Sequence, residues 1–347
     1  MESKANVTES GEFHKGGDNR EYLFTLSDRE RDSLYSDLAS VSGNPYENYH
    51  EFVTAIRELV ASSRSFDVLR KIASQISECR PEDSPFVFGR NCPIDKNLPI
   101  LDWENPVEDK KLNKTTYISE GFLAAMSILL VKPAIAHRSV NNGDFFHDIA
   151  PKKSMTESQS QKTLGTLKFH KDFTNHFAQP DFVLQVVLRN NPINEVYSTY
   201  VSNKEMIKRL DSDLIDELRR EKFYTPYDDI STKESTALSG KAKNHSIVEE
   251  NFRFRFFEGR TVGLDEKASS AVDQLITLMH HTKVRNIPRP GDFVLLRNHY
   301  CLHGKEVDSV SDPLELQNRW IMKTHNVEDI SKFEKFFETA SYGVVNG

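Results

Sequence analysis

Four residues of this sequence have the types that an iron centre with a dicarboxylate co-substrate requires. His170 and Asp172 are separated by one residue, His303 lies far downstream, and Arg319 follows it by sixteen positions. Two imidazoles and one carboxylate can bind one face of an Fe(II) ion and leave the opposite face open for chemistry. A guanidinium group can grip a carboxylate through two parallel hydrogen bonds. The combination predicts an iron-dependent oxygenase.

The two neighbouring ligands need an extended segment, because side chains two positions apart share one face of a strand. Residues 166–170 have the composition of such a strand, and the apolar run 292–296 would bring His303 to a strand end. We expect further strands at 145–149, 182–188, 252–257 and 319–324. A single His-x-Asp triplet is a weak signal in a chain with 12 histidines and 52 acidic residues, so the prediction depends on several features occurring together in order.

Helices are expected to cover these strands. Ser27 and Glu30 have the spacing of a capping box, and Phe52, Ile56 and Leu59 fall on one helical face. Further helices are predicted at 119–131, 204–222 and 266–281, whereas the proline-rich segment 79–103 is expected to be a winding connection. Many short strands with helical flanks predict an α+β fold, a double-stranded β-helix (jelly-roll) core with flanking helices.

The expected organisation is one domain behind a polar tail. Residues 1–20 are predicted to be disordered and residues 21–347 to form a single oxygenase domain. Within it we expect a helical N-terminal cover at about 21–135, the jelly-roll core at about 140–330 and a lid loop at about 224–250.

Composition excludes several other classes of protein. The net charge of −7 over 347 residues gives no basic footprint, so a nucleic-acid partner is not expected. No apolar run approaches the roughly 18 residues of a membrane span, and the first residues lack a signal-peptide pattern. Three cysteines make no disulfide framework. We therefore expect a cytoplasmic protein; no pattern in the sequence indicates its oligomeric state.

Longer motifs around the candidate ligands make the prediction specific. They are His170-Lys171-Asp172-Phe173-Thr174-Asn175-His176, Pro180-Asp181-Phe182-Val183-Leu184, Leu188-Arg189-Asn190, Pro290-Gly291-Asp292-Phe293-Val294-Leu295-Leu296-Arg297-Asn298, His303-Gly304-Lys305 and Arg319-Trp320. From about residue 143 to 324 the chain resembles the clavaminate synthase-like family of Fe(II)/2-oxoglutarate oxygenases, many of which hydroxylate free amino acids.

The resemblance implies a role for each matching residue. His170, Asp172 and His303 would hold Fe(II), and Arg319 would bind the distal carboxylate of 2-oxoglutarate with help from Thr199. His176 would lie in the layer around the ligands. The reaction would consume O2 and release succinate and CO2. Aspartate stands at the carboxylate ligand where most amino-acid hydroxylases of the family carry glutamate. Retention of a carboxylate at this position favours hydroxylation over halogenation.

The resemblance also suggests where a substrate would bind. Asn141 or Asn142, together with Lys323, would hold the head of an α-amino acid, and Glu258 would receive a cationic side chain. We therefore expect a free L-amino acid, basic or polar, similar to lysine, arginine or ornithine. A carrier-tethered or peptidic substrate, and desaturation or cyclisation, remain open alternatives.

Structural interpretations compete with these roles. His176 is also explained as a hydrogen-bonded core histidine, Thr199 as a β-branched strand residue, and Glu258 as a hairpin acid beside Gly259. Adjacent residues do not share a helix face, so His280 and His281 predict a solvated helix end. A binding protein with a vestigial site and a zinc hydrolase are alternative classes. The complete ligand set argues against the first, and Arg319 against the second.

Overall fold

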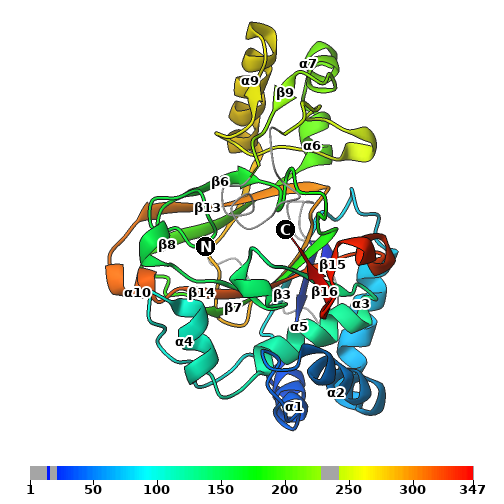
Figure 1. Ribbon diagram of the computed structural model, residues 1–347, viewed down its shortest axis with the longest axis vertical. Coiled ribbons are helices and arrows are strands. Elements are labelled where there is room, and N and C mark those ends of the chain that lie inside the picture. The colour runs from blue at the N-terminus through cyan, green and yellow to red at the C-terminus, as the bar shows by residue number, and fades with distance from the viewer. Residues whose placement is uncertain (1–13, 16–21, 228–241, 347) are drawn as a thin grey trace, which may run out of the picture.

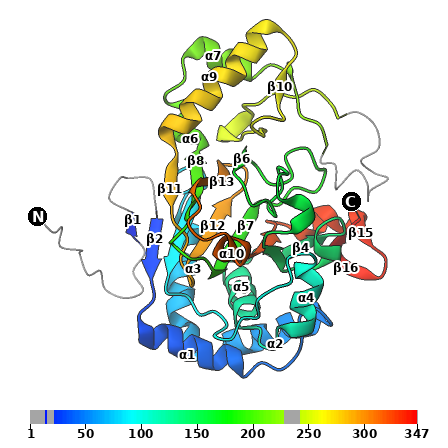
Figure 2. The ribbon, with the colours of Figure 1, turned by 90° about the vertical axis from the view of Figure 1, so that its left-hand side faces the viewer.

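The two main sheets of the described residues pack face to face, with helices on both outer sides (Figures 1 and 2). The computed structural model describes residues 14–15, 22–227 and 242–346. Nearly all of the predicted N-terminal tail and residues 228–241 of the predicted lid loop lie outside the described residues.

The larger sheet contains most of the strands. Among the described residues it has ten strands in the order β1-β2-β3-β12-β7-β14-β4-β16-β15, with β5 paired to β14. These are β1 (His14–Lys15), β2 (Tyr22–Thr25), β3 (Phe86–Arg90), β4 (Ala134–His137), β5 (His147–Ile149), β7 (Phe182–Arg189), β12 (Phe293–Arg297), β14 (Trp320–Asn326), β15 (Phe337–Glu338) and β16 (Ser341–Val345). The central strands β7 and β12 are buried along almost their whole length, which explains their continuous apolar runs.

The smaller sheet carries two of the candidate ligands. Its four described strands follow the order β11-β8-β13-β6. They are β6 (Leu167–His170), β8 (Glu195–Ser202), β11 (Val284–Asn286) and β13 (Cys301–Ser309). Phe86, Val183, Tyr200, Leu296 and Cys301 form an apolar cluster drawn from strands of both sheets, so this cluster lies between the two sheets.

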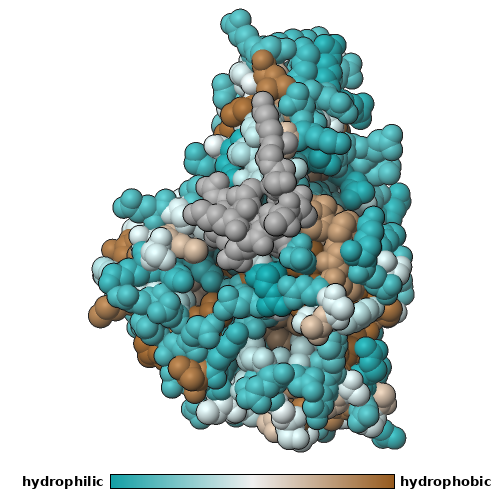
Figure 3. All heavy atoms as spheres, viewed as in Figure 1, coloured by the Kyte–Doolittle hydropathy of each residue, from teal (hydrophilic) through white to brown (hydrophobic). Residues whose placement is uncertain are grey.

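Helices bury the outer face of each sheet. The larger sheet packs on α1 (Asp28–Ala39), α2 (Tyr49–Ser62), α3 (Asp67–Glu78) and α5 (Ile118–Leu129), with α4 (Pro106–Asn113) beside them. The smaller sheet packs on α6 (Asn203–Ile207), α7 (Ser212–Leu218) and α9 (Glu266–Thr282). Two short strands, β9 (Phe223–Tyr224) and β10 (Val262–Gly263), pair with each other as a separate two-stranded sheet. Helix α10 (Pro313–Gln317) precedes β14. Hydrophilic side chains dominate the face seen in Figure 3.

Several local predictions are confirmed. The Ser27 and Glu30 side chains form both bonds of the capping box at the start of α1. Phe52 and Ile56 are buried on α2, and α5 and α9 lie where helices were expected. None of the helices in the described ranges is long and apolar enough to cross a membrane.

Other local predictions are wrong. Residues 204–222 form two helices instead of one, because Asp211 adopts an extended backbone between α6 and α7. The expected strand at 252–257 is mostly irregular and makes only isolated bridges, one of them between His170 and Phe257. The segment expected to be a winding connection contains β3, a strand of the larger sheet.

Candidate metal centre

The structure brings together the three predicted metal ligands. His170 on β6 and His303 on β13 stand directly opposite each other in the antiparallel register, with ring centroids 4.4 Å apart. Asp172 follows just after β6, and its Oδ1 lies 3.3 Å from His170 Nε2 and 3.4 Å from His303 Nε2. One ligand atom from each residue lies within 4.8 Å of the other two, and all three residues are buried. The arrangement has the two-histidine, one-carboxylate composition of a non-haem Fe(II) site.

Both histidines present a suitable nitrogen to a metal. His170 Nδ1 lies 2.9 Å from the Lys168 carbonyl, which can only accept a hydrogen bond. His170 Nδ1 therefore donates to this carbonyl, which fixes the ring with Nε2 directed at Asp172. Burial lowers the pKa of His303 to about 4, helped by the neighbouring His170. His303 is consequently neutral at physiological pH, as metal binding requires.

The backbone of Asp172 is clamped by a fully buried amide. Asn298 Oδ1 accepts a hydrogen bond from Asp172 N at 2.9 Å, and Asn298 Nδ2 donates to the Asp172 carbonyl at 3.0 Å. The same nitrogen donates to the Pro180 carbonyl at 2.9 Å. Phe173, the next residue, has a φ of 56°, so the chain turns sharply after the ligand. Asn298 thus fixes the position from which the carboxylate projects.

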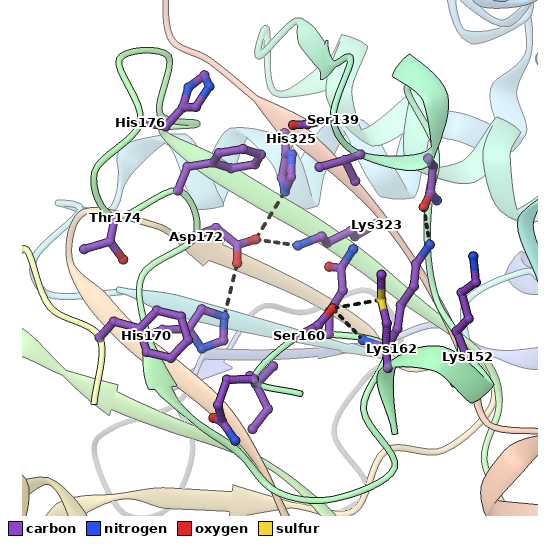
Figure 4. A pocket seen from close by; sticks show the side chains of 18 of the residues that line it. Ser139, Lys152, Ser160, Lys162, His170, Asp172, Thr174, His176, Lys323 and His325 are labelled. Atoms are coloured by element: carbon purple, nitrogen blue, oxygen red, sulfur yellow. Dashed lines mark hydrogen bonds and ion pairs between the residues drawn. The ribbon is translucent and has the colours of Figure 1, made fainter. Parts of the chain in front are cut away.

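The two oxygens of Asp172 have different surroundings. Lys323 Nζ lies 2.6 Å from Oδ2 and His325 Nε2 lies 3.2 Å from it, while Oδ1 faces His170 (Figure 4). Oδ1 also faces His303. Burial alone would raise the pKa of Asp172, but the Lys323 ammonium and hydrogen bonds from the three histidines hold it well below its usual range. Asp172 therefore remains anionic, with Oδ1 turned toward the ligand atoms of the histidines.

Arg319 and Lys305 form a second basic group beside the candidate ligands. Arg319 immediately precedes β14 on the larger sheet, and burial lowers its pKa to about 10, with Tyr200 opposing the shift. Its Nε has no hydrogen-bond partner within the described ranges. Lys305 shares the inner face of β13 with His303 and donates to the Thr163 carbonyl at 2.6 Å. Burial lowers the pKa of Lys305, and the charge of Arg319 lowers it further.

The position of Thr199 does not support its predicted role beside Arg319. In the register of β8 and β13, Tyr200 pairs with His303 and Thr199 pairs with Gly304. Neighbouring residues of a strand face opposite sides, so Thr199 faces away from the ligands. A Cβ atom added at Gly304 would lie 3.1 Å from Thr199 Oγ1. The Thr199 side chain therefore lies on the outer face of the sheet, the face toward which that Cβ would point. Tyr200 takes the inner position.

A pocket of about 420 Å³ opens over the candidate ligands. His170, Asp172, Lys323 and His325 lie on one side of it, and the connection between β5 and β6 forms another wall (Figure 4). Lys323, predicted to hold a substrate, therefore both lines the pocket and binds Asp172.

Asn141 and Asn142 also line the pocket, as expected of substrate residues. Asn141 Oδ1 accepts a hydrogen bond from Lys162 Nζ at 2.8 Å, while Asn142 Nδ2 donates to Glu108 Oε1 at 2.9 Å. Asn141 is buried, so its side chain is held in place within the wall.

Glu258 lies elsewhere. It is absent from the pocket lining, its Oε1 lies 3.1 Å from His280 Nε2, and its Oε2 accepts from Phe169 N at 3.3 Å. The predicted contact with a cationic substrate side chain is therefore not supported. His280 is exposed in the last turn of α9, as expected of a solvated helix end, and has this acidic partner.

His176 lines the pocket but is not in contact with the metal ligands (Figure 4). Its Nδ1 accepts from Ala178 N at 3.0 Å, and its ring meets the edges of His137 and Phe173. Burial lowers its pKa to about 4.

Three residues of the site were missed from the sequence: His325, Asn298 and Lys305. For His325 a signal existed, because it follows Lys323 by two positions and so shares its face of β14.

Comparisons with known proteins show which proteins share this fold. No protein-family model matches the chain. The L-asparagine oxygenase of Streptomyces coelicolor is 24% identical over 195 residues, 55% of this chain and 56% of that protein, so the match spans just over half the length of this curated relative.

The solved structures match over nearly the whole chain. Asparagine oxygenase in complex with Fe(II), (2S,3S)-3-hydroxyasparagine and succinate has a TM-score of 0.77 and 20% identity, covering 94% of this chain and 99% of that one. The non-haem iron oxygenase OrfP in complex with Fe, succinate and (3S)-hydroxy-L-arginine has a TM-score of 0.74 and 16% identity, covering 93% and 99%. The chain therefore has the fold of these solved oxygenases.

Proposed function

We propose that the protein is an Fe(II)/2-oxoglutarate-dependent oxygenase that hydroxylates an aliphatic carbon of a free polar L-amino acid, consuming O2 and releasing succinate and CO2. The observation that carries the proposal is the buried group of His170, Asp172 and His303, with Arg319 contributed by the facing sheet. A histidine pair with a single carboxylate suits Fe(II), and a buried guanidinium suits a carboxylate of 2-oxoglutarate.

The donor set fits these groups in charge as well as in type. His303 is neutral and Asp172 anionic, which are the protonation states that bind a metal. Arg319 is a buried cation, for which a carboxylate of the co-substrate would supply the missing charge. When bound, the iron with 2-oxoglutarate and O2 supplies the oxidising power for hydroxylation of a carbon–hydrogen bond.

The remaining residues of the site position Asp172 and line the pocket. Asn298 positions the Asp172 backbone, while Lys323 and His325 bind Oδ2 and leave Oδ1 for the metal. The pocket above Asp172 would hold the substrate, with Asn141 in its wall. Asparagine oxygenase and OrfP, whose complexes contain hydroxylated asparagine and arginine, support an amino acid as the substrate class. Glu258 gives no support for a basic side chain in particular.

The proposal extends to the organisation of the chain. The two facing sheets would form a double-stranded β-helix, and residues 21–347 would act as one oxygenase domain. All three cysteines are free thiols in the structure, which supports a reducing, cytoplasmic location.

Anaerobic reconstitution with Fe(II) and 2-oxoglutarate tests the proposal. We expect the weak visible charge-transfer band of a metal-bound keto acid, and then succinate release coupled to one member of a panel of free L-amino acids. Asp172→Ala should abolish the band, whereas Asp273→Ala, an exposed acid on α9, should leave it unchanged. Absence of the band in folded wild-type protein would overturn the proposal. A band without coupling to any free amino acid would favour a tethered or peptidic substrate.

A further inference from the structure

Positive charge predominates around the pocket. Among the described residues its lining includes five basic side chains, Lys152, Lys162, Lys171, Arg260 and Lys323. Burial lowers the pKa of Lys171 to about 7, so the other four carry most of the charge. Only two carboxylates, Glu108 and Asp172, line it, and Lys323 already pairs with Asp172. Fe(II) and doubly charged 2-oxoglutarate would add no net charge. The proposed substrate would therefore enter a pocket with excess positive charge.

Lys162 is the basic residue whose surroundings most clearly lack an anion. Its Nζ donates to Asn141 Oδ1 at 2.8 Å, and it forms no ion pair with a carboxylate in the described part of the chain. Burial lowers the pKa of Lys162 to about 8, so it remains mostly charged at neutral pH. Its polar partner is thus a neutral amide.

Asp148, the carboxylate that most affects the pKa of Lys162, already has hydrogen-bond partners of its own. Asp148 Oδ2 accepts from Lys110 Nζ at 2.6 Å and from Asn141 Nδ2 at 3.4 Å, and Asp148 Oδ1 accepts from Trp320 Nε1 at 3.0 Å. Because Asp148 can only accept, the Asn141 amide must turn its nitrogen to Asp148 and its oxygen to Lys162. The Asn141 amide therefore holds Lys162 at the pocket without neutralising it.

Lys152 adds a second cation to the same wall. The backbone nitrogen of Lys152 donates to the Lys162 carbonyl at 3.1 Å, so the two lysines come from paired segments of one connection. Figure 4 shows both on the side of Lys323 away from His170. The charge of Lys152 also lowers the pKa of Lys162, which places the two cations within electrostatic range.

We propose that Lys162, held by Asn141 and supported by Lys152, binds the side-chain carboxylate of an acidic amino-acid substrate. The inference rests on the proposed function and narrows its substrate class. An ammonium donates three hydrogen bonds and accepts none, so a carboxylate satisfies it, whereas a lysine or arginine side chain brings a like charge. Lys323 lies nearer the candidate ligands and already pairs with Asp172, so Lys162 is the lysine free of a carboxylate partner among the described residues.

The test compares acidic amino acids with their amides. Succinate release by the reconstituted enzyme is measured with aspartate, glutamate, asparagine, glutamine, lysine and arginine, and anaerobic calorimetry gives substrate affinity independently of turnover. We expect kcat/KM for aspartate or glutamate to exceed that for the amide and basic substrates. Lys162→Gln should lower the affinity for the acidic substrate by about 10- to 100-fold, the range of one charge-assisted bond, and spare the amide.

Two variants control for indirect effects. Lys153→Gln changes an exposed neighbouring lysine that pairs with Glu104 outside the pocket, and it should leave both affinities unchanged. Lys162→Arg keeps the charge and should retain preference for the acid over the amide, even if affinity falls. Thermal unfolding of each variant verifies that it is folded.

The outcomes separate this inference from the proposed function. Coupling to lysine or arginine in preference to the acids would overturn the inference and leave the oxygenase intact. An equal loss for aspartate and asparagine in Lys162→Gln would assign Lys162 to the α-carboxylate and also overturn it. Absence of the visible band in the wild type would overturn both.

Discussion

Replacing Asn298 with alanine should weaken both the fold and the metal centre. The side chain makes three buried hydrogen bonds, two to the backbone of Asp172 and one to the Pro180 carbonyl. At about 1 kcal/mol each, their loss lowers the free energy of unfolding by about 3 kcal/mol, and the unpaired groups left behind add to this. Because Asp172 loses its anchor, metal affinity should fall by about 10- to 100-fold, the range for residues that orient a ligand.

Urea unfolding of the metal-free protein and a metal titration measure the two effects. Asn190→Ala is the matched control, since Asn190 is buried but donates a single hydrogen bond, to the Pro288 carbonyl at 2.8 Å. It should cost about 1 kcal/mol and leave metal affinity unchanged. Equal destabilisation by the two substitutions, or unaltered metal binding in Asn298→Ala, would refute the reasoning.

Three further perturbations follow from buried charges. Arg319→Leu should abolish 2-oxoglutarate binding in calorimetry. Because the substitution removes a buried cation, it should not lower the thermal unfolding midpoint of the ligand-free protein. A large drop in that midpoint would contradict this. Lys110→Met leaves the Asp148 carboxylate buried without its ion-pair partner, so the free energy of unfolding in urea should fall by about 3–5 kcal/mol. Adding Asp148→Asn should restore part of that free energy. No recovery in the double variant would argue against the ion pair. Burial also lowers to about 4 the pKa values of His176, His299, His303 and His325. In the unfolded chain these histidines bind protons near pH roughly 6.5, whereas in the folded chain they stay neutral down to about 4. The free energy of unfolding should therefore be highest above pH roughly 6.5 and fall as the pH is lowered toward 4. Identical urea midpoints at pH 7 and pH 5 would contradict this.

The fold was predictable where the local pattern was strong. The apolar run of β12 and the amphipathic pattern of α9 identify these elements directly. β3 was missed because its short apolar run lies in a proline-rich segment, and its pairing with β12 and β2 makes it a strand. The division between α6 and α7 depends on the backbone of Asp211, which the apolar stripe of that segment does not indicate.

The site divides in the same way. The two-residue spacing of His170 and Asp172 indicates a shared face, and family motifs indicated His303 and Arg319. Thr199 was misassigned because the inner face of β8 is set by its register with β13, and one position decides between Thr199 and Tyr200. The contact of Lys323 with Asp172 and the clamp of Asn298 are tertiary and leave no spacing pattern in the sequence.

His170 and His303 are 133 positions apart in the chain and yet face each other across one pair of strands. Pairing of β6 with β13 closes a long loop, so it carries a large entropic cost and a high contact order. A partly folded chain that lacks this pairing would not have the complete ligand set. Metal binding would therefore select the fully folded chain, and its binding free energy would add to global stability. Iron uptake would then report the completion of folding in this protein.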